Sequence, residues 1–215
     1  MKTWCRLAAP LFLASQLSTT VLAQSNPGWI IEVVGGTVSP SNPSVTVKLR
    51  AFFFSVFPST AFGGGDSDIG SSDPMGKFSD MQYGADLFGF CPLGQVGVPS
   101  ATGGVTGINI GQIQVLGCLA NPANPIEIWR ATWTTSDFTP RTVELNTTGT
   151  THFELYSHHG ASFPDIFFDP KDVIPGSAVI QVIPAPGVLA LLLTGAALTT
   201  RRRGASSTTI RARGC

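Results

Sequence analysis

Apolar and polar residues alternate one by one along several segments of this chain. The clearest segment is 43–54, where every second residue is apolar: Val45, Val47, Leu49, Ala51 and Phe53. Successive side chains of a β-strand point to opposite faces, so this segment is predicted to be a strand with one buried face. Segments 141–146 and 151–157 alternate in the same way. In the second of these, Phe153 and Leu155 are expected to point inward, and His152, Glu154 and Tyr156 outward.

Less regular apolar segments predict further strands at 29–34, 108–116, 126–133 and 178–183. Stretches rich in glycine, proline and asparagine favour turns between them, at 35–36, 39–43, 63–65, 103–104, 121–125 and 146–149. Residues 142–146 and 151–157 are predicted to form a β-hairpin across 147–150. One short helix is predicted at 77–88, and 86–90 is either a weak strand or a helical turn.

About seven or eight strands separated by turns predict an all-β fold, a single antiparallel β-sandwich. The order of an extended first strand, a regular second strand and a glycine-rich excursion resembles jelly-roll, cohesin-like or immunoglobulin-like sandwiches of bacterial surfaces. This architectural resemblance implies no binding residues.

The N-terminus has the order of a secretory signal peptide. Lys2 and Arg6 precede a mostly apolar segment, 7–22, and the small residues of Val21-Leu22-Ala23 form a cleavage site. We expect a signal helix over 1–23 and cleavage between Ala23 and Gln24. The alternative is a buried N-terminal helix.

The C-terminus combines a proline pair, an apolar run and a basic cluster. Pro184, Ala185 and Pro186 precede the uncharged run 188–200, and Arg201, Arg202 and Arg203 follow it. The run has 13 residues, fewer than the ~20 of a bilayer-spanning helix, although segment 179–183 adds apolar length before the prolines. A short transmembrane helix is expected at about 187–200. The arginines then stay cytoplasmic and the preceding domain lies outside.

These C-terminal features resemble the PEP-CTERM sorting signal of Gram-negative bacteria, over about residues 182–203. Ala185 stands where that family has glutamate, and a basic tail, 204–215, follows. Proteins with the signal are exported, processed by an exosortase protease and associated with extracellular polysaccharide. The resemblance therefore implies an exosortase partner, a transient membrane anchor and a place at the outer surface or in the extracellular matrix. A plain C-terminal anchor is the alternative.

The zero formal charge of the whole chain hides an acidic domain. Region 24–182 contains all 13 acidic residues but only six of the 13 basic ones, which gives a net charge of −7. An acidic domain without basic runs is a poor candidate for binding nucleic acid.

Cysteine placement predicts one disulfide bond. Cys5 lies in the leader and Cys215 in the tail, which leaves Cys91 and Cys118 in the exported domain. An even pair in an oxidising compartment predicts a disulfide between them. Two separate buried thiols are the alternative.

Two groups of residues are weak candidates for metal binding. Asp66, Asp68 and Asp73 in the glycine-rich segment 63–73 could supply oxygen ligands to calcium, but their spacing departs from the EF-hand pattern, so a solvated loop is favoured. His158 and His159, with Asp165 and Asp169 nearby, are the second group. They lack the usual spacing of metal ligands. In addition, adjacent residues at the end of a strand point to opposite faces and so rarely bind one metal together.

No catalytic motif stands out: a Gly-x-Ser-x-Gly elbow and a phosphate-binding glycine motif are both missing. Trp129, Trp133 and Tyr156 could form an aromatic platform for sugars, although core packing is the more common role of such residues. The leading interpretation is a non-enzymatic exported surface or matrix protein without a cofactor. The alternatives are a carbohydrate-binding module of the polysaccharide matrix and a secreted hydrolase with an unrecognised site.

Overall fold

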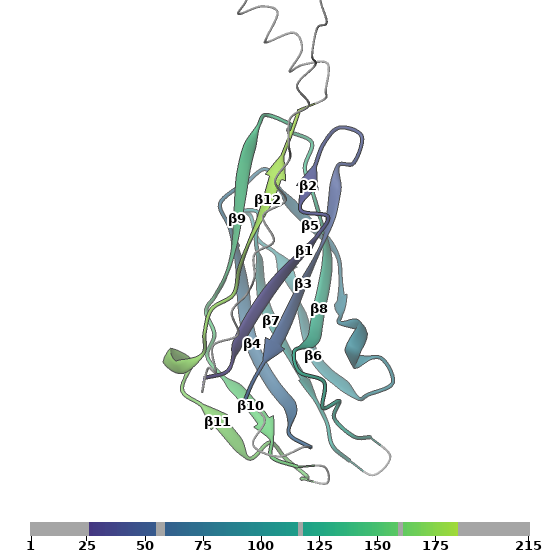
Figure 1. The fold of residues 1–215 in the computed structure, drawn as a ribbon, viewed down its shortest axis with the longest axis vertical. Helices are drawn as coiled ribbons and strands as arrows, with labels where there is room; N and C mark the ends of the chain where they lie inside the picture. The colour runs from purple at the N-terminus through teal and green to yellow at the C-terminus, as the bar shows by residue number, and fades with distance from the viewer. Residues whose placement is uncertain (1–25, 55–58, 116–117, 159–160, 185–215) are drawn as a thin grey trace, which may run out of the picture.

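Two β-sheets stacked face to face form the domain, in a computed structural model that describes residues 26–54, 59–115, 118–158 and 161–184 (Figure 1). The predicted signal peptide, its cleavage site, Ala185, Pro186, the transmembrane helix, the arginine cluster and the basic tail all lie outside these residues. Within the described ranges, no helix has the length and apolar character needed to cross a bilayer.

The smaller sheet has four antiparallel strands in the order β1-β3-β8-β5. Its strands are β1 (Gly28–Val34), β3 (Ser44–Phe52), β8 (Ile126–Thr134) and β5 (Lys77–Tyr83). The alternation predicted for β3 is confirmed, because Val45, Val47, Leu49 and Ala51 are all buried. Their polar neighbours lie on the outer face of the sheet.

The larger sheet follows the order β11-β10-β4-β9-β12-β2, while β7 pairs with the other side of β4 and β6 pairs with β7. Its strands are β2 (Thr37–Val38), β4 (Ala61–Ser71), β6 (Pro92–Pro99), β7 (Val105–Gln112), β9 (Arg141–Thr148), β10 (Phe153–Tyr156), β11 (Ile166–Phe168) and β12 (Ser177–Val182). Every pairing in it is antiparallel except that of β12 with β2. The predicted all-β sandwich is therefore confirmed.

An aromatic cluster fills the space between the sheets near the start of β4. Trp29, Phe62 and Phe153 contact one another with ring centroids 5.0–6.2 Å apart. Phe153 and Leu155 point inward as predicted. Tyr156 points to the opposite face with His152 and Glu154, as predicted, but it is only 2% exposed, because it is buried in a second, small cluster with Ala61 and Ala120 and its hydroxyl donates to the Gln112 carbonyl.

The predicted hairpin between β9 and β10 is wrong. Both strands run in the same direction along one side of β4, which pairs Asp68 with Thr148 and Gly65 with Phe153. The segment between them offsets the chain without reversing it. The Asp66 carboxylate holds this offset by accepting hydrogen bonds from the backbone N–H groups of Thr151, at 2.7 Å, and His152, at 2.9 Å.

Two further local predictions are wrong. Segment 77–88 forms strand β5 and a 3₁₀ turn, η1 (Ala85–Leu87), because Phe78 pairs across the sheet with Trp133 and is buried. Residues 63–71 lie in strand β4 instead of a solvated loop. A Cβ on Gly65 would come within 2.8 Å of the Trp29 ring, so glycine here makes room for the core.

Candidate functional site

A groove of about 590 Å³ lies on the larger sheet, close to the start of β4 and the ends of β7 and β10. Glycines line its floor, namely Gly63 and Gly64 of β4 and Gly111 of β7. Its walls carry the exposed apolar side chains of Leu93, Ile113, Val115 and Phe163, together with the half-buried Pro164. The groove is therefore a mainly apolar surface depression in the sheet.

The floor is flat because its glycines have no side chains, and at Gly111 the backbone sterically excludes one. A Cβ on Gly111 would come within 2.7 Å of the Gly63 carbonyl oxygen. A Cβ on Gly64 would come within 2.8 Å of Glu154 Oε1, which places the Glu154 carboxylate directly over this glycine. Glycines at such positions let a ligand approach the backbone closely.

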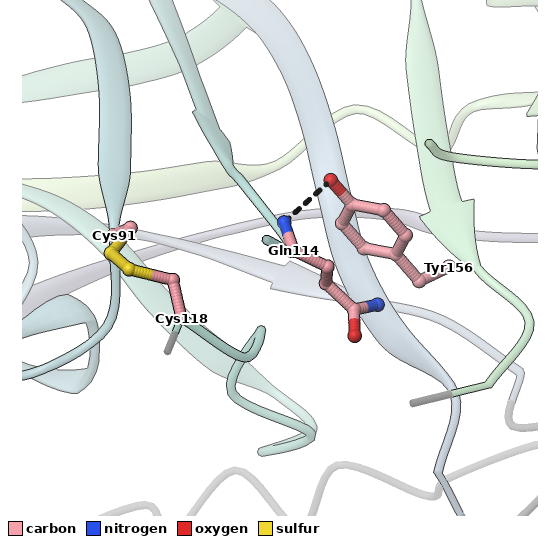
Figure 2. The surroundings of a disulfide bond; sticks show 4 residues. All are labelled: Cys91, Gln114, Cys118 and Tyr156. Atoms are coloured by element: carbon pink, nitrogen blue, oxygen red, sulfur yellow. Dashed lines mark hydrogen bonds between the residues drawn. A yellow bond between two sulfur atoms is a disulfide. The ribbon is translucent and has the colours of Figure 1, made fainter. Parts of the chain in front are cut away.

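A buried hydrogen-bond network supports one wall of the groove. The Tyr156 hydroxyl accepts a hydrogen bond from the Gln114 N–H at 3.3 Å (Figure 2). It also donates one to the Gln112 carbonyl at 2.8 Å. The Gln112 side chain donates to the Phe62 carbonyl and accepts from the Asn121 N–H, both at 2.8 Å. Burial raises the pKa of Tyr156, and the nearby Glu154 charge adds to this, so the phenol stays protonated as a donor.

A disulfide bond fixes the same wall. It joins Cys91, which precedes β6, to Cys118, and the two Cα atoms are 5.8 Å apart (Figure 2). The Ile113 N–H donates to the Cys91 carbonyl at 3.0 Å, and the Cys118 N–H donates to the Val115 carbonyl at 2.8 Å. The disulfide and these bonds hold Ile113 and Val115 beside the glycine floor.

Glu154 is the charged group on the groove floor that lacks a partner. Among the described residues its carboxylate makes no ion pair and no hydrogen bond, and no lysine or arginine lines the groove. The neighbouring His152 is engaged elsewhere, with Nδ1 3.3 Å from Asp66 Oδ1. The groove therefore offers one unpaired negative charge between apolar walls.

The three aspartates considered for calcium have separate structural roles. Asp66 accepts hydrogen bonds from the segment between β9 and β10. Asp68 accepts a hydrogen bond from the Gly107 N–H at 2.7 Å, and Asp73 pairs with Arg141 at 2.8 Å. In the part of the chain that the structure describes, no three potential metal ligands come together.

The residues around His158 also form no catalytic relay. Ser157 Oγ lies 2.8 Å from His158 Nδ1 and donates to Asp165 Oδ2 at 2.5 Å, so the serine stands between the other two. Asp169 caps η2 (Pro170–Asp172) by accepting from the Lys171 N–H at 3.1 Å. His159 lies outside the described residues.

The three aromatic residues considered for sugar binding are all buried. Trp129 and Trp133 are 0% exposed and Tyr156 is 2% exposed. Trp129 Nε1 donates to the Val96 carbonyl of β6 at 2.9 Å, which ties the two sheets together. These residues therefore support the sandwich and offer no aromatic platform.

No protein-family model matches this chain, and no curated protein is similar to it. Some solved structures share a remote likeness. A cohesin module from a family 33 glycoside hydrolase of Clostridium perfringens is 11% identical, with a TM-score of 0.48 over 75% of this chain and 99% of that one. The seventh ScaB type I cohesin from Pseudobacteroides cellulosolvens is 13% identical, with a TM-score of 0.47 over 74% of this chain and 94% of that one. A type I cohesin–dockerin complex from Clostridium thermocellum gives 12% identity and a TM-score of 0.45 over 73% of this chain and 99% of that one. TM-scores below 0.5 are too low to transfer a partner or a function to this chain.

Proposed function

We propose that this protein is an exported, non-catalytic binding module whose groove faces away from the cell. The C-terminal sorting signal delivers it to the outer surface or the extracellular matrix, with transient anchoring in the membrane. The groove then binds a partner in that space.

The position of the groove relative to the C-terminal end of β12 carries this proposal. Figure 1 shows β12 leaving one end of the sandwich, whereas β10 and β11 lie at the opposite end. The groove lies at the β10 end, because Tyr156 lines it and pairs with Ala61 at the start of β4. Anchoring through the residues after β12 would present the groove to the surroundings.

The terminal segments supply the argument for sorting. Ala23 and Gln24 mark the expected cleavage site of the leader, while Pro184, Ala185 and Pro186 resemble the exosortase recognition motif. Arg201, Arg202 and Arg203 then keep the end of the chain cytoplasmic until processing.

Mass spectrometry of both termini tests the sorting. The full chain is expressed in a Gram-negative host that has an exosortase, and in a matched host without one. We expect mature protein that begins at Gln24 and, only in the first host, ends near Pro186. An intact Arg203 in both hosts would support a plain anchor, and an intact leader in the cytoplasmic fraction would contradict export.

The non-catalytic assignment is tested with the exported protein on a panel of polysaccharides and esters. We expect no turnover above the empty-vector control. Hydrolysis that a single substitution abolished, for example His158→Ala, would overturn it.

A further inference from the structure

We propose that the groove binds a peptide segment in which apolar side chains flank one lysine or arginine, and that this basic residue pairs with Glu154. The inference rests on the proposed function and adds the chemistry of the partner. It follows from the juxtaposition of apolar walls, a glycine floor and an unpaired carboxylate.

The walls leave apolar surface open to water. Phe163 is 80% exposed, Val115 55%, Leu93 41% and Ile113 37%, although they belong to different segments of the chain. Leu93, Ile113 and Val115 come together because β6 pairs with β7, and Phe163 joins them because it follows β10, which pairs with β4 next to β7. Apolar side chains gathered around a concave surface are typical of interaction sites.

Charge complementarity favours a basic residue on the partner. Several carboxylates elsewhere in the domain have partners within the chain, for example Glu127 with Lys48 and Asp73 with Arg141. Glu154 has none among the described residues, and it lies over Gly64 between apolar walls. An ammonium or guanidinium group placed there would gain a charge-assisted hydrogen bond that water screens only partly.

The remaining polar groups favour a peptide over a sugar or a lipid surface. A sugar needs several free hydrogen-bonding side chains, but Gln112 and Gln114 are already bonded to backbone carbonyls of this chain and His152 lies against Asp66. Among the described residues, this leaves Asn109 and Ser162 as the neutral polar side chains of the lining. The walls are mainly aliphatic, which suits apolar side chains better than stacking sugar rings. An anionic bilayer would meet Glu154, and none of the described residues that line the groove is a lysine or arginine that could attract it.

The test uses the full chain, purified in detergent, on an array of synthetic seven-residue peptides. Valine and leucine flank a central Lys, Ser or Glu in otherwise identical peptides. We expect Lys peptides to be bound at least about tenfold more tightly than Glu peptides, with the preference falling at high salt. Glu154→Gln should reduce this preference to less than about threefold.

Glu144→Gln is the matched control, because Glu144 is exposed on β9 of the same sheet and also has no ion pair among the described residues. It should leave the preference unchanged. Phe163→Asp should weaken binding of all the peptides, and since this side chain is exposed, the circular dichroism spectrum should match that of the wild type.

Two outcomes would overturn the inference. Equal binding of Lys and Glu peptides would do so, and so would binding of glycans or phosphatidylglycerol vesicles instead of peptides. If Phe163→Asp abolished that glycan or vesicle binding, the groove would still be the functional site and the proposed function would stand. If none of these probes bound, or binding ignored both Glu154→Gln and Phe163→Asp, the groove would fail in both roles.

Discussion

Removal of the Cys91–Cys118 disulfide should lower the stability of the domain by a measurable amount. The two cysteines are 27 positions apart, so the bond closes a loop of about 28 residues. The loop-entropy relation then gives a contribution of about 3–4 kcal/mol to the free energy of unfolding. For a domain of this size, the corresponding fall in Tm is about 6–16 °C.

Urea unfolding of wild type, Cys91→Ser, Cys118→Ser and the double variant measures this effect. We expect the three variants to lose similar stability, because each removes the same bond. Reductant should shift the wild-type midpoint to that of the double variant and leave the double variant unchanged. A wild-type midpoint insensitive to reductant, together with two free thiols by mass spectrometry of alkylated protein, would refute the disulfide.

Three further predictions concern the core, the smaller sheet and the offset strand. Phe153→Ala should cost about 3–5 kcal/mol in urea unfolding because the ring is buried in the aromatic cluster, whereas Phe167→Ala, with a ring 70% exposed, should cost less than about 0.5. Glu127→Gln removes the buried partner of Lys48 and Arg130 and should lower the free energy of unfolding by about 3–5 kcal/mol. Glu32→Gln, on the exposed rim, should lower it by about 1 kcal/mol or less, and equal losses in the two variants would contradict this. Burial opposes ionisation of Asp66, but hydrogen bonds from the segment between β9 and β10 outweigh it and lower the pKa. The stabilisation is therefore complete above the pKa of the unfolded chain, about 3.9, and is lost as pH falls through the folded pKa. Urea unfolding at pH values from 7 to 3 should show that the free energy of unfolding falls less in Asp66→Asn than in wild type.

Strands that obey a simple period could be predicted from the sequence, and those that depend on tertiary partners could not. β3 alternates cleanly, so its buried face followed from Val45, Val47 and Leu49 alone. β4 contains three consecutive glycines, a pattern that favours a loop when considered locally. It is a strand because it lies between β7 and β10, and because glycine at position 65 makes room for Trp29.

The same limitation affected the hairpin prediction. Residues 147–150 carry a turn signal, and Gly149 does adopt a positive φ of 68°. The hydrogen bonds that decide its outcome are accepted by Asp66, more than 80 positions earlier in the sequence. A local sequence pattern contains no information on such a distant partner. The turn between β9 and β10 therefore predicts a hairpin, although the two strands run in the same direction.

The disulfide could be predicted from the oxidising compartment and from the even number of cysteines in the exported domain, whereas the groove could not be predicted. Leu93, Ile113 and Phe163 belong to three separate segments and have no common period. The glycines of β4 are the one sequence signal that relates to the groove. Considered alone they predict a flexible loop, and only the pairing of β4 with β7 shows that they line the floor of the groove.

Rigidity of the groove follows from how its two halves are supported. The floor belongs to central strands, where β4 pairs on both sides, and the aromatic cluster packs beneath it. One wall is tied by the Cys91–Cys118 bond and by hydrogen bonds through Tyr156. A groove built in this way loses little conformational entropy when it binds a partner, which lets a small apolar surface and one carboxylate give useful affinity. Reduction of the disulfide should therefore weaken binding of the lysine peptides as well as stability, although neither cysteine lines the groove.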